Sequence, residues 1–128
     1  MSNYIYENIR TSSILTTSYV AGTVLNFKNI SPQDKNQLII YVAFTKGSLT
    51  TAELKVEFSH DGITYYQETF SSISSGTSTE TLGEHSFSAS GNYRIAVPIK
   101  DSYIKISVKG TGTVTSSSMA VDAVLGNV

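Results

Sequence analysis

Alternation of apolar and polar residues is the dominant pattern along this chain. It is clearest in residues 53–59, where Leu54, Val56 and Phe58 alternate with polar side chains. Because successive strand residues point to opposite faces, the pattern predicts a strand with one face in a core and the other in water. Related patterns predict further strands over residues 23–27, 38–45, 63–70, 93–99, 104–109 and 119–125.

The segment Leu38–Phe44 departs from this alternation, because it carries apolar residues at nearly every position. A strand that is apolar on both faces is typical of the middle of a sheet. We therefore expect residues 38–45 to form a central strand.

A tight turn is predicted between the strands at 53–59 and 63–70. Asp61-Gly62 is a strong hairpin signal, because a type I′ turn needs positive φ angles and glycine tolerates them. Asp61 and Gly62 are therefore interpreted as a structural turn.

Three segments lack a clean pattern. Residues 71–83 are rich in Ser, Thr and Gly, which fits either a long loop or an exposed hairpin. Residues 34–36 follow Ser31-Pro32 and fit one short helical turn. The stretch 1–19 fits either an ordinary first strand or an arm that pairs with a neighbouring molecule. The residues proposed for such an arm are Asn3, Tyr4, Ile5, Tyr6, Glu7, Asn8, Ile9 and Arg10.

Together these elements predict a single all-β domain over residues 1–128. Seven or eight short strands with frequent turn signals are typical of an antiparallel β-sandwich. A jelly-roll-like arrangement is favoured, with an immunoglobulin-like sandwich as the alternative. The immunoglobulin landmarks of a cysteine pair and a tryptophan are missing, since the chain has neither residue.

The composition argues against several classes of function. The net charge is −1 and no basic cluster is present, which argues against binding nucleic acid through its phosphates. No apolar run approaches the length needed to span a bilayer, so we expect a soluble chain without a membrane partner. The absence of cysteine excludes disulfides, thiolate metal ligands and a cysteine nucleophile.

Candidate catalytic groups are few. His60 lies beside Asp61 in the predicted turn, and Glu84 and His85 should point to opposite faces of a strand. Glu53 and Glu57 are too far apart for a pair of glycosidase carboxylates. We therefore expect no enzyme activity, no metal and no cofactor.

Three tyrosines are candidates for ligand or interface contacts: Tyr65, Tyr66 and Tyr103. An exposed tyrosine on a sandwich can stack on a sugar ring or anchor a protein interface. Strand tyrosines also make ordinary cross-strand contacts, and that interpretation stays open beside the first.

The residues Leu54–Tyr66 resemble the strand, Asp-Gly turn and Thr-aromatic-Tyr hairpin of small structural proteins of tailed-bacteriophage particles. The closing segments 93–98 and 103–113 are similar to theirs as well, so the resemblance runs from Leu54 to about Leu125. It implies an auxiliary or decoration protein at the capsid surface of a virion, or a fibre- or tail-associated domain. It also implies many copies, contacts with major capsid or other virion proteins, and a homo-oligomer, with a trimer favoured.

Three hypotheses follow. The first is the capsid auxiliary protein. The second is a carbohydrate-binding or adhesin module of a fibre or tail, against which the absence of tryptophan counts. The third is an enzyme such as a glycosidase fragment, for which the sequence offers no paired carboxylates.

Overall fold

The computed structural model describes residues 5–26, 37–67, 69–74, 76–82, 84–99 and 101–126, with only the backbone described in 69–74 and 77–82. The helical turn predicted at residues 34–36 lies outside these ranges, as do Asn3 and Tyr4 of the predicted arm. The described chain consists of strands and the turns that join them.

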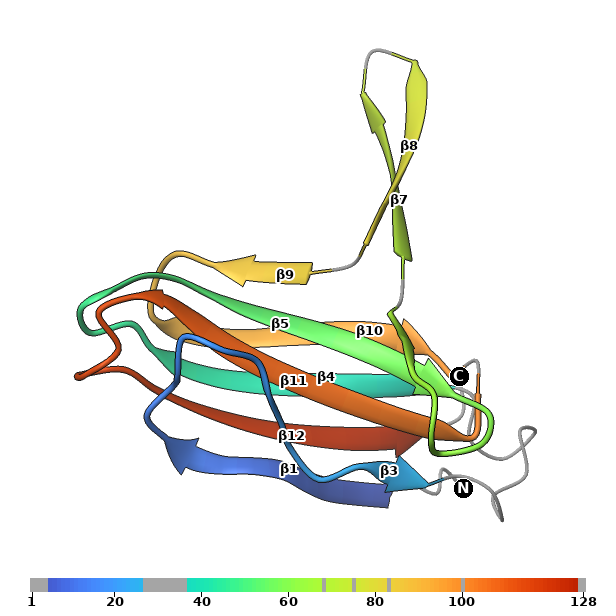
Figure 1. Ribbon diagram of the computed structural model, residues 1–128, viewed down its shortest axis with the longest axis horizontal. Coiled ribbons are helices and arrows are strands. Elements are labelled where there is room, and N and C mark those ends of the chain that lie inside the picture. The colour runs from blue at the N-terminus through green and yellow to red at the C-terminus, as the bar shows by residue number, and fades with distance from the viewer. Residues whose placement is uncertain are drawn as a thin grey trace.

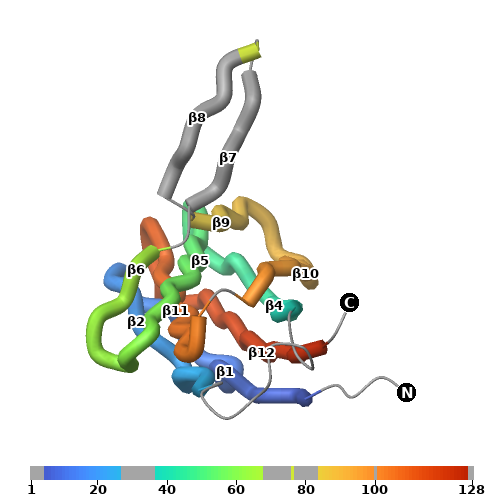
Figure 2. The backbone as a smooth tube through the Cα atoms, turned by 90° about the vertical axis from the view of Figure 1, so that its right-hand side faces the viewer, coloured from blue at the N-terminus to red at the C-terminus, as the bar shows by residue number. Residues whose placement is uncertain are grey.

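Two antiparallel sheets pack face to face (Figures 1 and 2). The four-stranded sheet has the order β1 (Ile5–Ser13), β12 (Ser118–Gly126), β4 (Gln37–Thr45) and β10 (Gly91–Pro98). The second sheet has the order β2 (Val20–Ala21), β11 (Tyr103–Gly112), β5 (Leu49–Ser59) and β6 (Tyr66–Gln67). In this second sheet β3 (Leu25–Asn26) also pairs with β11, and β9 (Glu84–Phe87) also pairs with β5.

The order of the strands is that of a jelly roll. The chain crosses between the sheets repeatedly, so that β12 inserts between β1 and β4, and β11 lies between β2 and β5. Neighbours far apart in sequence are thus joined in antiparallel ladders, as in two nested Greek keys. The prediction of an all-β, jelly-roll-like sandwich is confirmed.

One edge strand is interrupted. Both β6 and β9 pair with β5, with Gln67 opposite Glu57 and Glu84 opposite Lys55. Only Val56 of β5 lies between these two pairings, so residues 68–83 are an insertion into what is otherwise one edge strand. The insertion contains β7 (Thr69–Ser74) and β8 (Thr77–Leu82), which pair with each other in a hairpin that is separate from the two main sheets. Of the two alternatives for residues 71–83, the hairpin is therefore correct.

The core lies between the two sheets and takes alternate residues from each. Leu38 and Ile40 of β4 meet Leu54 and Val56 of β5 and Ile104 of β11 in this layer, and all five are fully buried. Burying each such side chain stabilises the fold by about 1.5–3 kcal/mol. β4 lies between β12 and β10, as its apolar sequence predicts.

The turn after β5 is wider than predicted. Gly62 has the expected positive φ of 77°, but the returning strand β6 begins at Tyr66 rather than at Ile63. The reason is a local hydrogen-bond network that fixes a longer loop. The Asp61 carboxylate accepts bonds from the backbone N–H groups of Ile63 at 2.8 Å and Thr64 at 2.9 Å. The Ser59 hydroxyl accepts one from the Gly62 N–H at 2.9 Å.

Candidate interaction surfaces

The N-terminal residues form a strand of the chain's own sheet. Residues 5–13 are β1, which pairs with β12, with Ile5 opposite Leu125 and Asn8 opposite Asp122. The register shifts on either side of Arg10, whose guanidinium donates to the carbonyls of Met119, Ser13 and Ile14. On the free edge, the Ile9 carbonyl accepts a bond from the Thr23 N–H at 2.9 Å.

Irregularities of this kind blunt an edge strand against pairing with another chain. The described part of the predicted arm is thus the first strand of the sandwich. That Ile5–Arg10 contact a partner stays a prediction.

The three candidate tyrosines gather at one end of the second sheet, and two of them have partners in the chain. The ammonium group of Lys105 lies 4.1 Å from the centre of the Tyr65 ring. A Cβ atom at Gly62 would lie 3.1 Å from the Tyr103 ring, so that ring supports the loop after β5. Tyr66 is 59% exposed and is the one of the three that offers a ring to solvent.

The outer face of the second sheet carries many charges, and these charges have partners. We define the β5 face as Tyr19, Glu53, Lys55, Glu57, Glu84, Lys105, Ser107 and Lys109. The ladders align opposite charges across strands, with Lys105 opposite Glu57 and Lys109 opposite Glu53. Glu53 is buried and accepts a bond from the Thr111 hydroxyl at 2.6 Å. Lys55 and Glu57 form an ion pair at 3.7 Å.

Tyr19 covers the middle of the β5 face. The ammonium groups of Lys55 and Lys109 lie 4.5 Å and 4.9 Å from the centre of the Tyr19 ring. Burial, together with the nearby carboxylate of Glu84, raises the pKa of the Tyr19 hydroxyl above its ordinary value. The segment that follows β1 therefore closes this face with the chain's own residues.

The outer face of the four-stranded sheet is different in character. We define the β4 face as Ile39, Tyr41, Ala43, Asn92, Arg94, Ala96, Ala120, Asp122 and Val124, the outward residues of β4, β10 and β12. Tyr41 is 42% exposed, and Ala43 and Ala96 are also exposed. Within β4, β10 and β12, Arg94 and Asp122 are the only charged residues. No described segment of the chain crosses this face.

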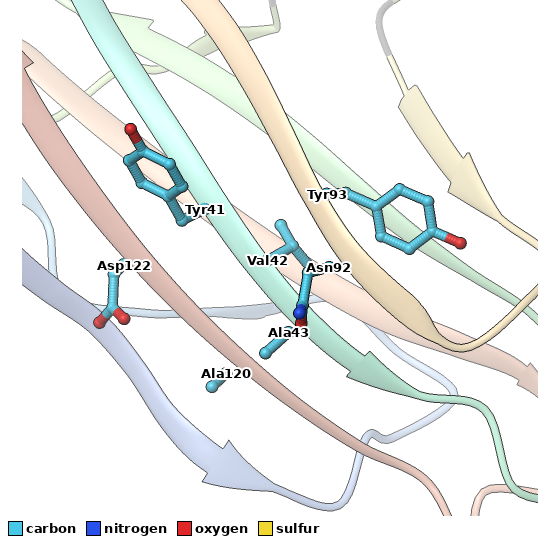
Figure 3. Close-up of a pocket in the computed structure, with 7 residues that line it drawn as sticks. All are labelled: Tyr41, Val42, Ala43, Asn92, Tyr93, Ala120 and Asp122. Atoms are coloured by element: carbon cyan, nitrogen blue, oxygen red, sulfur yellow. The ribbon is translucent and has the colours of Figure 1, made fainter.

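A shallow depression lies at the centre of the β4 face (Figure 3). Its floor is formed by the short side chains of Ala43 and Ala120, and Tyr41, Asn92 and Asp122 stand around it. The Asp122 carboxylate accepts a bond from the Asn8 amide at 2.8 Å, and it also raises the pKa of the Tyr6 hydroxyl by accepting its hydrogen bond. The floor is therefore apolar, with one carboxylate and one amide at the rim.

The candidate catalytic groups do not meet in a site. The Asp61 carboxylate is held by backbone N–H groups, which lower its pKa to about 2. His85 lies opposite inward-facing Leu54, and burial lowers its pKa. No group of three potential metal ligands occurs in the described part of the chain. Nor do the described residues form a helix that is long and apolar enough to cross a membrane.

The β4 face is the surface that sequence reasoning did not identify. One signal for it was present, because residues 38–44 are apolar on both faces while only one face is covered by the chain's own core. The neighbours that complete the face, Arg94 and Asp122, are brought to β4 only by long-range pairing.

Comparison with known proteins shows a likeness of fold. No protein family matches the sequence, and no curated protein does. The PBSX exported protein XepA has a TM-score of 0.66 at 10% identity, over 97% of this chain and 37% of that chain. A structure of infectious bursal disease virus, Gx strain, has a TM-score of 0.54 at 10% identity, over 98% of this chain and 32% of that chain. The chain thus spans about a third of the length of each structure, and what it shares with them is the β-sandwich.

Proposed function

We propose that this protein is a non-enzymatic structural component of a virus particle, and specifically an auxiliary or decoration protein bound in many copies at the capsid surface. The observation that carries the proposal is the β4 face, which is weakly charged, exposed and uncovered by the chain's own described residues. Exposed apolar sheet surface of this kind is typical of proteins that associate with others.

Two further observations support the proposal. The jelly-roll sandwich resembles, in fold, a chain from a structure of infectious bursal disease virus, and the segment from Leu54 resembles structural proteins of tailed-bacteriophage particles. Two of the described carboxylates that could serve in catalysis are engaged in structural roles, Glu53 with Thr111 and Asp61 with its loop. Fold and surface together favour assembly over catalysis.

The mechanism would be multivalent. A single copy presents a modest surface to other virion proteins and to other copies of itself, and each contact is weak. Many copies on a symmetric shell bind strongly together, because every additional contact is made at high effective concentration. No nucleic acid, membrane or cofactor takes part in this mechanism.

The test is whether the protein is present on particles. Particles from cells that carry the gene would be purified on a density gradient, and the chain would be counted against the major capsid protein by quantitative mass spectrometry. The proposal expects the chain in the particle fraction, in a fixed ratio of many copies per particle. Absence of the chain from purified particles would contradict it.

Carbohydrate binding is the second candidate, because Tyr66 presents an exposed ring at the end of the second sheet. A glycan array with the wild-type chain tests it, and Tyr66→Ala is the matched variant. Retention of a glycan by the wild type and its loss in Tyr66→Ala would favour an adhesin-type module.

A further inference from the structure

The β4 face has a charge arrangement that is complementary to itself. Asp122 lies opposite Tyr41 in the β12–β4 ladder, and Arg94 lies opposite Tyr41 in the β4–β10 ladder. One row across the sheet therefore reads Asp122, Tyr41, Arg94, with the two charges about 10 Å apart at ~4.8 Å per strand. The two do not pair within the chain, since Lys55 with Glu57 is the one ion pair among the described residues.

A two-fold rotation about an axis above β4 and parallel to it exchanges the two sides of this row. It places Arg94 of one copy over Asp122 of the other, and Asp122 of the first over Arg94 of the second. The adjacent rows match under the same operation. Ala96 and Val124 lie on either side of Ile39, so the rotation places Ala96 of one copy over Val124 of the other. Asn92 and Ala120 lie on either side of Ala43, so they meet across the two copies in the same way.

We infer that the β4 face is an isologous interface between two copies of this chain, in which Arg94 of each copy pairs with Asp122 of the other. Face-to-face packing of two sheets is a common arrangement, with the sheets about 10 Å apart. Tyr41 and Ile39 of both copies lie next to the axis, where their exposed apolar surface is removed from water.

A second copy fits this face better than an unrelated partner does. Any partner could cover the apolar residues, but the positions of Arg94 and Asp122 on either side of Tyr41 make the face complementary to itself. Closed two-fold pairing is also the commonest form of homo-oligomer. The β5 face offers no such match, because its opposite charges lie against each other within the chain, whereas Asp122 is bonded to the neutral side chains of Asn8 and Tyr6.

The size of the face sets the strength of the contact. Three strands at ~4.8 Å spacing and about eight residues at ~3.3 Å rise give a footprint of roughly 400 Å². This lies below the ~800 Å² per partner of a standard interface, so the isolated dimer is expected to be weak. Sedimentation should therefore extend to protein concentrations of about 1 mM.

Charge exchange between variants tests the inference. Arg94→Asp places two carboxylates against each other at both ends of the interface, and Asp122→Arg places two guanidinium groups there. Each variant alone should be monomeric. A mixture of the two restores both opposite-charge pairs in a heterodimer, and so does the double variant R94D/D122R with itself. Lys105→Asp on the β5 face is the matched control and should dimerise like the wild type.

A second pair of variants keeps the test independent of the hydrogen bonds that Asp122 makes. Ala96→Asp and Val124→Lys alter the next row and leave Asn8 and Asp122 in place. Each should weaken self-association, while their mixture should associate at least tenfold more tightly than either alone. Circular dichroism would establish that all variants fold.

Dimerisation of the wild type with rescue in the mixtures supports the inference. A wild-type chain that stays monomeric at every concentration would overturn it, as would a trimer whose mass is unaffected by the exchanges. Sedimentation uses the isolated chain, so these results are independent of whether the chain is found on particles.

Discussion

The two outer faces of the sandwich differ in how the chain treats them. On the β5 face, six charged side chains are paired across strands, hydrogen-bonded or placed over Tyr19 and Tyr65. On the β4 face, Arg94 and Asp122 stand among alanine, isoleucine, valine and tyrosine. Asp122 accepts hydrogen bonds from Asn8 and Tyr6 of β1, and no described segment crosses the face. Both faces belong to the same sandwich and lie over the same core.

The pattern of polar residues shows which face the chain covers with its own side chains. A strand exposed to water on one side alternates apolar with polar residues, as β5 does with Leu54, Lys55 and Val56. β4 does not alternate in this way, because Ile39 and Ala43 stand where polar residues would serve solvation. We infer that the chain itself completes the β5 face and that association completes the β4 face.

The largest loss of stability is expected at Ile40 of β4, while the adjacent residue Tyr41 should contribute little to stability. Ile40→Ala empties a fully buried position and should lower the free energy of unfolding by about 2–5 kcal/mol. Tyr41→Ser, one residue later and outward, should lower it by less than about 1 kcal/mol while weakening self-association. Urea unfolding of dilute protein, together with sedimentation, measures both quantities. A large loss of stability in Tyr41→Ser would show that Tyr41 serves the fold.

The next effect concerns the loop that closes the end of the second sheet. Gly62→Val should destabilise the chain by about 1–3 kcal/mol, because a β-branched residue resists a φ of +77° and its Cβ would press on the Tyr103 ring. Gly76→Val is the matched control, and it should destabilise the chain less than Gly62→Val does. Gly76 has a similar φ of 79° but no neighbouring atom within 4 Å, and it lies in the hairpin outside the sandwich. Equal melting temperatures for Gly62→Val and the wild type would remove this role of Gly62.

A smaller effect is expected in the middle of the β5 face. Tyr19→Leu keeps an apolar cover but removes the ring beneath Lys55 and Lys109, so the loss of stability should be about 1 kcal/mol. Self-association should not change, because the β5 face takes no part in it. Thermal unfolding measures the loss of stability, and sedimentation up to about 1 mM measures association. A Tyr19→Leu chain that stays monomeric where the wild type dimerises would contradict the assignment of association to the β4 face.

The smallest change in stability is expected at Asp61, and it depends on pH. Backbone N–H groups lower the pKa of Asp61 to about 2 in the folded chain, against about 3.9 when unfolded. A lowered folded pKa means that the carboxylate stabilises the fold fully above pH 4, and that this contribution is lost as the pH falls towards 2. Asp61→Asn keeps the shape but not the charge. Its melting temperature should lie below that of the wild type at pH 6, and the gap should close near pH 2. A gap that is constant with pH would contradict this assignment.

Sequence reasoning predicted the sandwich because its central strands have a readable local period. The segments at 53–59, 104–109 and 119–125 alternate, and each is a strand that contributes to the core. The first strand was harder to predict, because the register shifts around Arg10 break its period. The turn at Asp61-Gly62 was predicted too short, since the hydrogen bonds of Ser59 and Asp61 stabilise a longer loop that competes with the tight one.

Most of the β4 face could not be predicted from the sequence. Residues 38–44 carry the signal of a strand with two apolar faces, but nothing local says that the second face is left open. Arg94 and Asp122 are distant in sequence from each other and from Tyr41. Only the registers of the β10–β4 and β12–β4 ladders place them in one row.

One measurement tests the difference between the faces most directly: the molar mass of the wild type and of two single-site variants by sedimentation equilibrium at protein concentrations up to about 1 mM. Ala43→Arg puts a long charged side chain at the centre of the β4 face, and Lys105→Ala removes one from the β5 face. We expect the wild type and Lys105→Ala to associate equally, and Ala43→Arg to be monomeric with an unchanged melting temperature. Equal masses for all three chains, or a loss of association in Lys105→Ala alone, would contradict it.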